Sequence, residues 1–288
     1  MFVGVSRPTA PHFPIPDVDA ALVARHAENC GFESILYGEH PIRPVAEHTA
    51  NEVHTEGVPY FQETIVALSR VSAMTTRIRF GFGVCLVMQH HPVRLAKQLA
   101  CLDYYSGGRL MVGVGTGWSK AEAEAIGGNF SRRWAQTAEA VKLMRELWTK
   151  ECVEHDGEFF KVPPVHCFPQ PKQQPGPPIL MGANGEKGFQ RIVDFCDGWM
   201  PALVTPEQIA EGPEFIRTAR AQIVELAQQK GRDMSRMPIT VILRGAVDRN
   251  VIQRFEDTGI ERVNIIIPYF ETEDQAREQL EKLAANVL

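Results

Sequence analysis

The stretch AKQLACLDYYSGGRLMVGVGTGW, from Ala96 to Trp118, is the most informative part of this chain. Apolar residues at positions 93, 96, 99 and 100 recur at helical spacing, and Ser106-Gly107-Gly108 is typical of a helix end because glycine tolerates left-handed backbone. Residues 109–114 then predict a short buried strand, which Gly115-Thr116-Gly117 follows. In α/β proteins ligand sites lie at that end of a strand, where glycines let backbone N–H groups approach an anion. The stretch therefore predicts a helix, a turn, a strand and a binding loop.

Strand and helix patterns alternate along the rest of the chain, which favours a parallel sheet covered by helices. Strands are expected at 2–6, 34–40, 78–87, 109–114, 178–181, 198–204, 239–245 and 262–268. Helices are expected at 17–29 (capped by Asp17), 60–74, 93–105, 119–126, 132–148, 186–195, 213–229 and 272–285. About eight β/α units in a chain of 288 residues predict an α/β fold of the (β/α)8 TIM-barrel type. An open doubly wound sheet is the alternative, but it expects a glycine fingerprint after the first strand, where this chain has SRPTAPHFP.

Two insertions interrupt the alternation: one after the second strand, at 40–59, and one before the fifth strand, at 149–177. Within the latter, EHDGEFF predicts a hairpin with Asp156-Gly157 at its turn, and the repeated prolines of FPQPKQQPGPP disfavour helix. We see no internal repeat beyond the β/α units and no low-complexity tail, so residues 1–288 are expected to form a single domain.

Composition limits the partners and the compartment. Hydrophobic residues make up 44% of the chain and the net charge is −5, which argues against nucleic acid or an anionic membrane as the main partner. No apolar run is long enough to span a bilayer and no signal peptide is visible, so a cytoplasmic location is expected. The six cysteines contain no CxxC pair and are expected to be reduced. The cluster of Cys152, His155, His166 and Cys167 fits no familiar zinc spacing, so no metal is expected.

Glu39 and His40 end the expected second strand, at the mouth of a barrel of this type. Histidine can give or take a proton near neutral pH, as hydride chemistry on an alcohol or carbonyl requires. The structural alternative is a histidine that is only hydrogen-bonded at a strand end. Neighbouring strand residues face opposite ways, so both side chains can line one pocket only if the strand ends between them.

The run from Ala96 to Trp118 resembles the luciferase-like superfamily of barrel oxidoreductases, whose pattern is roughly AKQxAxLDxxSgGRxxxGvGxGW. The likeness extends from residue 2 to about 203, includes PQPKQQPGPPI before the fifth strand, and is greatest to the branch that uses the deazaflavin coenzyme F420. The resemblance implies that His40 acts at the reacting centre and that Glu39 lies near the cofactor. It also implies a non-proline cis peptide between Gly83 and Val84, against which the middle ring of the deazaflavin leans.

Two further turns are assigned by the same resemblance. Thr116-Gly117 is expected to meet the phosphate-bearing tail of the cofactor, and Gly182-Ala183-Asn184 is expected to touch the cofactor as well. For Asn184 alone, capping the following helix is an equal alternative. Trp118 occupies the position at which the sugar-phosphate dehydrogenase branch has a catalytic acid. Tryptophan cannot transfer protons, so the sugar-phosphate dehydrogenase activity is not expected here. Trp118 either lines the wall of the pocket or is packed in the protein interior.

These features predict an F420-dependent oxidoreductase that transfers a hydride between the deazaflavin and a small carbonyl, activated double bond or alcohol. The first alternative is an FMN-dependent monooxygenase on the same barrel, which needs oxygen and a reductase. A non-catalytic flavin or deazaflavin carrier is the second. A metal-dependent barrel hydrolase is the third alternative. Such an enzyme usually has a His-x-His motif after the first strand, where this chain has Val5-Ser6-Arg7. His90-His91 is expected at the surface, and a homodimer is expected by analogy with relatives.

Overall fold

In the computed structural model, the run from Ala96 to Trp118 folds as its pattern predicts. The structure describes residues 1–7, 10–12, 18–42, 44, 59–60 and 62–288. Helix α3 (Pro92–Tyr105) ends at Ser106, and Gly107 and Gly108 follow with φ of 73° and 90°. Strand β6 (Leu110–Gly115) is buried along its whole length. These positive φ angles explain the two glycines, because residues with side chains rarely adopt them.

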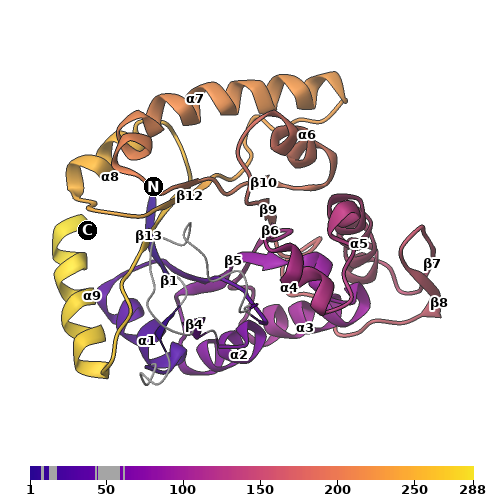
Figure 1. Ribbon diagram of the computed structural model, residues 1–288, viewed down its shortest axis with the longest axis horizontal. Coiled ribbons are helices and arrows are strands. Elements are labelled where there is room, and N and C mark those ends of the chain that lie inside the picture. The colour runs from indigo at the N-terminus through magenta and orange to yellow at the C-terminus, as the bar shows by residue number, and fades with distance from the viewer. Residues whose placement is uncertain (8–9, 13–17, 43, 45–58, 61) are drawn as a thin grey trace.

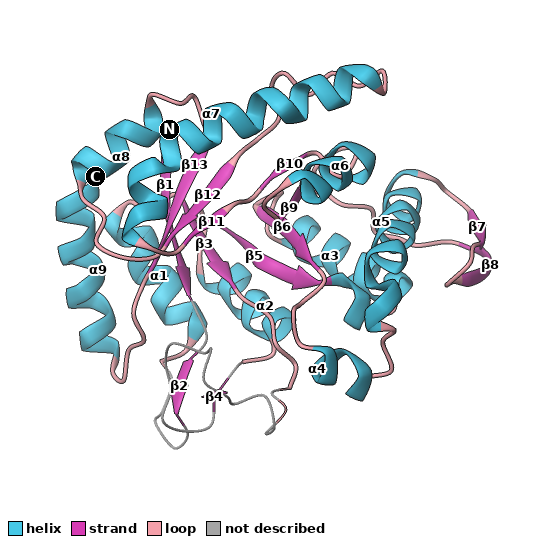
Figure 2. Ribbon diagram, turned by 45° about the horizontal axis from the view of Figure 1, so that its top comes forward, coloured by secondary structure: helices cyan, strands magenta, loops and turns pink. Residues whose placement is uncertain are grey.

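The strands form one curled, mostly parallel sheet of nine strands in the order β10-β9-β6-β5-β3-β1-β13-β12-β11 (Figures 1 and 2). Its first and last members, β10 and β11, are consecutive in the sequence and are separated only by Met200-Pro201. Trp199 also bridges to Ile239, just before β12. The remaining strands are β1 (Phe2–Arg7), β3 (Ser34–Tyr37), β5 (Arg79–Leu86), β9 (Ile179–Met181), β10 (Gly198–Trp199), β11 (Ala202–Leu203), β12 (Thr240–Leu243) and β13 (Arg262–Ile266).

Helices surround the outside of this sheet (Figure 1). They pack on it through one large cluster of buried apolar side chains. A second, smaller cluster lies inside the curl and forms the floor of its interior; its members are Leu36, Met111, Leu180, Met200 and Ile242. The other helices are α1 (Ala20–Cys30), α2 (Thr64–Met74), α4 (Lys120–Ala125), α5 (Arg133–Thr149), α6 (Glu186–Phe195), α7 (Pro206–Gln229), α8 (Arg249–Glu256) and α9 (Glu273–Val287). None of the helices in the described part of the chain has the length and apolar character needed to cross a bilayer.

Four element predictions need correction. The expected strand 198–204 is the two short strands β10 and β11. Helix α7 begins at Pro206 rather than at Pro213, because Thr205 and Gln208 form a reciprocal capping box there and Pro213 is accommodated inside the helix. Helix α8 was not predicted, and helix 60–74 begins only at Thr64, where Glu63 caps it.

Other differences concern the start of α1 and the two insertions. Asp17 lies outside the described residues, and the side chain of Asp19 caps α1 by accepting from the backbone N–H of Ala21 at 2.9 Å. Most of the insertion at 40–59 also lies outside the described residues. The hairpin predicted around Asp156 is confirmed: β7 (Val153–Asp156) and β8 (Lys161–Val165) pair antiparallel. The remaining two short strands, β2 (Ala10–His12) and β4 (Pro59–Tyr60), form a separate antiparallel pair.

Candidate functional site

A cavity of about 390 Å³ lies at the carboxyl ends of the parallel strands. It is lined by residues at or just after the ends of seven strands, which the curl of the sheet brings together. These are Ser6 and Arg7 (β1), Gly38, Glu39 and His40 (β3), Gly83, Val84 and Leu86 (β5), Gly115, Thr116, Gly117 and Trp118 (β6), Gly182 (β9), Ile242 and Arg244 (β12) and Ile266 (β13), with Trp134 from α5. The volume is within the range of about 300–1,000 Å³ that ligand pockets occupy.

The bulge on β5 shapes one wall of this cavity. The peptide bond between Gly83 and Val84 is cis, which confirms the prediction made from the resemblance, and the pairing of β5 with β6 shifts register there. The side chain of Val84 fills the space between two neighbouring glycines. A Cβ at Gly115 would lie 2.7 Å from Val84 Cγ2, and one at Gly182 would lie 2.6 Å from Val84 Cγ1. Both positions therefore need glycine because Val84 projects toward them.

His40 is held by a carboxylate that the sequence reasoning missed. Its Nδ1 lies 2.9 and 3.1 Å from the two carboxylate oxygens of Glu122, in the first turn of α4. Glu122 is fully buried, whereas the His40 side chain retains 15% exposure toward the cavity. An ionised carboxylate can only accept hydrogen bonds, so Nδ1 carries the hydrogen in this pairing and Nε2 is the ring nitrogen that can take up a proton.

The local sequence explains how Glu122 reaches this place. Ser119 caps α4 by accepting from the Glu122 backbone N–H at 2.9 Å, and α4 begins five residues after β6 ends. This sets α4 beyond the carboxyl ends of β5 and β6 (Figure 2). The spacing Ser119-x-x-Glu122 is a helix-start signal that was available in the sequence. Nothing in the sequence alone indicated that the carboxylate turns inward to His40.

Glu39 and His40 both line the cavity, because β3 ends at Tyr37 and the strand alternation that would have separated them no longer applies. The Glu39 carboxylate nevertheless has its own partners. One oxygen accepts from the backbone N–H of Leu86 at 2.6 Å, and the other lies 2.9 Å from Nε2 of His90. Glu39 thus ties the end of β3 to the end of β5.

The expectation that His90 lies at the surface is wrong. Its side chain is 19% exposed and bonds to Glu39. Burial by itself lowers the pKa of His90, but the hydrogen bond to Glu39 and the negative charges of Glu39 and Glu63 outweigh it and raise the pKa. His91 is exposed, as expected.

The loop after β6 lines the cavity. Thr116 is buried, Gly117 has a φ of 69°, and both lie on the cavity wall. Trp118 stands at the mouth with 55% exposure, and its ring meets the His40 ring edge-on with centroids 6.1 Å apart. Trp118 therefore walls the cavity rather than packing in the core.

The turn after β9 lines the cavity only through Gly182. The Ala183 carbonyl accepts from Nε1 of Trp199 at 2.7 Å, and Asn184 is exposed and donates to the Ala202 carbonyl at 3.4 Å. Asn184 does not cap α6, whose N-cap is Gly185. Two of the three residues predicted in this turn thus hold the turn in place and do not face the cavity.

Both histidines of the expected cysteine–histidine cluster are engaged in hydrogen bonds. His155 bonds to Glu139 at 3.2 Å, His166 bonds to the Glu151 carbonyl at 2.7 Å, and Cys152 is exposed. The one His/Cys/acid group close enough to hold an ion among the described residues consists of Glu39, Cys85 and His90. Burial and the charge of Glu39 raise the pKa of the Cys85 thiol well above its usual range.

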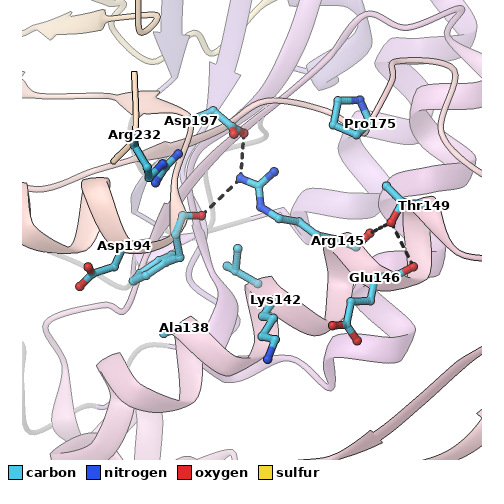
Figure 3. Close-up of a pocket in the computed structure, with 11 residues that line it drawn as sticks. Ala138, Lys142, Arg145, Glu146, Thr149, Pro175, Asp194, Asp197 and Arg232 are labelled. Carbon is cyan, nitrogen blue, oxygen red and sulfur yellow. Dashed lines mark hydrogen bonds and ion pairs between the residues drawn. The ribbon is translucent and has the colours of Figure 1, made fainter. Parts of the chain in front are cut away.

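A larger hollow of about 650 Å³ lies elsewhere, in the outer groove between α5 and α6 (Figure 3). Its central cation, Arg145, is paired with Asp197 at 2.9 Å and also donates to the Phe195 carbonyl. None of the residues that line the hollow lies at the carboxyl end of a strand, and its central cation is already paired. We therefore place the functional site in the smaller cavity.

The family is decided by comparison with known proteins. Residues 8–286 match the model of the luciferase-like monooxygenase family. The chain belongs to this family. An uncharacterized protein of Mycobacterium tuberculosis is 33% identical over 277 residues, 94% of each chain. An F420-dependent hydroxymycolic acid dehydrogenase of the same species is 30% identical over 180 residues, which are 62% of this chain and 47% of that protein.

Solved structures share the fold of this family member at low sequence identity. The monooxygenase RslO1 from Streptomyces bottropensis has a TM-score of 0.79 and 18% identity, covering 99% of this chain and 98% of that one. An F420-dependent secondary alcohol dehydrogenase, in complex with an F420-acetone adduct, has a TM-score of 0.74 and 18% identity with the same coverage. The proteins similar to this chain therefore include an F420-dependent dehydrogenase by sequence, and a monooxygenase and a second F420-dependent dehydrogenase by fold.

Proposed function

We propose that this protein is an F420-dependent oxidoreductase that exchanges a hydride between the deazaflavin and a small organic substrate, either a carbonyl, an activated double bond or an alcohol. The observation that carries the proposal is the pairing of cavity-facing His40 with the fully buried Glu122. A histidine oriented in this way is suited to move the proton that accompanies hydride transfer. The F420-dependent relatives support the choice of cofactor.

The cavity has the features that a ring with an anionic tail requires. Gly115 and Gly182 make room for the side chain of Val84, so the Gly83–Val84 bulge places an apolar side chain on the cavity wall, where the ring would lie. Ser6 lines the cavity, and its hydroxyl oxygen is buried with no hydrogen-bond partner among the described residues. The residues that would hold the cofactor are Gly83, Val84, Thr116, Gly117 and Gly182.

When bound, the deazaflavin supplies two-electron hydride chemistry. His40 takes a proton from an alcohol, or gives one to a carbonyl oxygen, through Nε2. Glu122 fixes the hydrogen on Nδ1 and balances the charge when the ring is protonated. Trp118 covers His40 at the mouth and keeps water from it. Glu39 holds the end of β5 in place through Leu86, so we assign it a positioning role rather than proton transfer.

Replacement of His40 tests this proposal. His40→Ala should lower turnover about 10²- to 10⁴-fold while F420 still binds, because general acid–base catalysis contributes that much. Turnover is followed by F420 absorbance against a panel of alcohols, enones and aldehydes, and binding by F420 fluorescence. Unchanged turnover would remove His40 from the mechanism. If the wild type binds F420 tightly but turns over none of the substrates in the panel, the non-catalytic carrier is favoured.

The specific rival is an FMN-dependent monooxygenase, which the fold shared with RslO1 supports. Titration of the purified protein with F420, FMN and FAD, read by fluorescence, separates the two. Preferential FMN binding together with reductase- and oxygen-dependent turnover would overturn the F420 assignment.

We further propose that the curled sheet is an eight-stranded barrel in which β10 and β11 count as one broken strand. The single domain, the homodimer and the cytoplasmic location stay predictions.

A further inference from the structure

Three side chains of the kinds that bind transition metals converge beside the cavity. They belong to Glu39, which follows β3, Cys85 in β5, and His90, which follows the short helix η2 (Val87–Gln89). One carboxylate oxygen of Glu39, the sulfur of Cys85 and one ring nitrogen of His90 all lie within 4.8 Å of one another. Among the described parts of the chain, no other group of three His, Cys, Asp or Glu residues comes as close.

The spacing and the chemistry of these atoms suit a zinc ion. Zn²⁺ binds thiolate, imidazole and carboxylate at about 2.0–2.3 Å, so the ligand atoms around one tetrahedral ion lie roughly 3–4 Å apart. Glu39 Oε1 and His90 Nε2 are 2.9 Å apart, so small side-chain shifts would place the three ligand atoms around one ion. A set of sulfur, nitrogen and oxygen favours Zn²⁺ over Mg²⁺ or Ca²⁺, which take oxygen ligands.

The protein already holds two of the three ligands in place. Cys85 is fully buried within β5, and Glu39 is buried with its second carboxylate oxygen 2.6 Å from the backbone N–H of Leu86. A hydrogen bond of this kind, made by the oxygen that does not bind the ion, orients a metal-binding carboxylate. The His90 side chain keeps 19% exposure, which gives an ion a way in from the surface.

Negative charge exceeds positive charge around the cluster. The carboxylates of Glu39 and Glu63 both act on Cys85 and His90. Within the described ranges, the ion pair of Glu39 is with His90, whereas Glu63 pairs with no cation and accepts from the backbone N–H of Val66 at 2.6 Å. A divalent cation would balance these carboxylates and would displace the proton of the thiol, since a coordinating thiol is deprotonated.

We propose that Glu39, Cys85 and His90 bind one Zn²⁺, which fastens the end of β3 to β5 and η2 beside the cavity. In the metal-free protein His90 stays hydrogen-bonded to Glu39, as described above. The sequence did not suggest this site, because Glu39 lies far from the other two ligands along the chain and meets them only through the pairing of β3 with β5. The site does not depend on the proposed function, since none of its ligands is assigned to proton transfer or to contact with the deazaflavin.

Zinc binding to the purified chain tests the site. The protein is stripped with a chelator, incubated with Zn²⁺ and passed through a desalting column, and its zinc is measured by mass spectrometry. The wild type should retain about one Zn²⁺ per chain, with an affinity set by competition with a chromophoric chelator. Cys85→Ser and His90→Gln should each weaken the affinity more than tenfold, since even the loss of a group behind a ligand costs about 10- to 100-fold. Mg²⁺ should not compete.

Matched controls are a second buried cysteine and the neighbouring histidine. Cys196 is fully buried at the end of α6, and His91 is exposed next to His90, so Cys196→Ser and His91→Gln should bind zinc as the wild type does. Less than half a zinc ion per chain in the wild type would overturn the site. Unchanged affinity in both Cys85→Ser and His90→Gln, or equal losses in the control variants, would overturn it as well.

Cobalt gives a reading that does not depend on the stability of the variants. Co²⁺ in place of Zn²⁺ should produce the near-ultraviolet absorption of a cobalt–thiolate bond in the wild type and in Cys196→Ser. If Co²⁺ binds without this absorption, the ion lies elsewhere and the proposal is wrong. Zn²⁺ should also raise the melting temperature of the wild type more than that of His90→Gln. None of these measurements uses F420 or turnover, so failure of the metal site and failure of the proposed function are distinguishable.

Discussion

Glu122→Gln is the most direct test of how the site works. Glutamine has nearly the same shape and keeps one acceptor oxygen near His40 Nδ1, but it removes the negative charge. In the native protein both carboxylate oxygens lie within 3.1 Å of that nitrogen, and the carboxylate is fully buried, so solvent does not screen the pair. A hydrogen bond to a charged group contributes about 1.5–3 kcal/mol, which corresponds to a loss of about ten- to a hundredfold in kcat.

The assay is a double-mutant cycle with His40→Ala, with kcat followed by F420 absorbance and F420 affinity by fluorescence. Because Glu122 acts through His40, Glu122→Gln should reduce kcat in the wild type and have no further effect in the His40→Ala background. F420 affinity should stay the same. A nitrogen-15 NMR spectrum of the histidine rings should also place the hydrogen of wild-type His40 on Nδ1. Equal losses in both backgrounds, or a weakened F420 affinity, would refute the reasoning.

Two further predictions concern stability. Gly81→Ala would place a Cβ 1.8 Å from the Met111 backbone oxygen on the neighbouring strand, so we expect the free energy of unfolding, measured in urea, to fall by about 3 kcal/mol or more. In the control Gly38→Ala the new Cβ meets nothing within 4 Å, so its free energy of unfolding should stay near that of the wild type. Similar stabilities of the two variants would contradict this prediction. Glu39 raises the pKa of His90 above 6.5 in the folded protein. Protonated His90 therefore stabilises the folded state fully below pH 6.5, and this contribution is lost as the pH rises through the folded-state pKa. The free energy of unfolding of the wild type should therefore exceed that of His90→Gln by more at pH 6 than at pH 9, and a pH-independent difference would speak against the His90–Glu39 pair.

Local signals in the sequence were sufficient for most elements and for the loop after β6. Gly107 and Gly108 adopt the positive φ that their place at a helix end suggested. The predicted helix began at Pro213, although Thr205 and Gln208 offered a stronger start. Propensity is a weak guide where capping and packing against the sheet compensate for one missing hydrogen bond.

The partners of side chains could not be predicted in the same way. Glu122 and His40 are 82 residues apart and meet because β3 and β6 end at the same rim of the sheet. His90 was expected at the surface, since an adjacent proline marks a helix start but does not show where the ring turns. The wrong expectation for His90 and the failure to predict Glu122 have the same cause. Both side chains are placed by contacts between segments that lie far apart in the sequence.

The sequence by itself determined the order of strands and helices, the turns that require glycine, and the family to which the chain is similar. These depend on backbone preferences and hydrophobic spacing, which act over a few residues. Only the tertiary structure decided which charged groups meet: Glu122 with His40, and Glu39 with His90. Electrostatic and hydrogen-bond energies depend on distance and burial in space, and the curl of the sheet sets both.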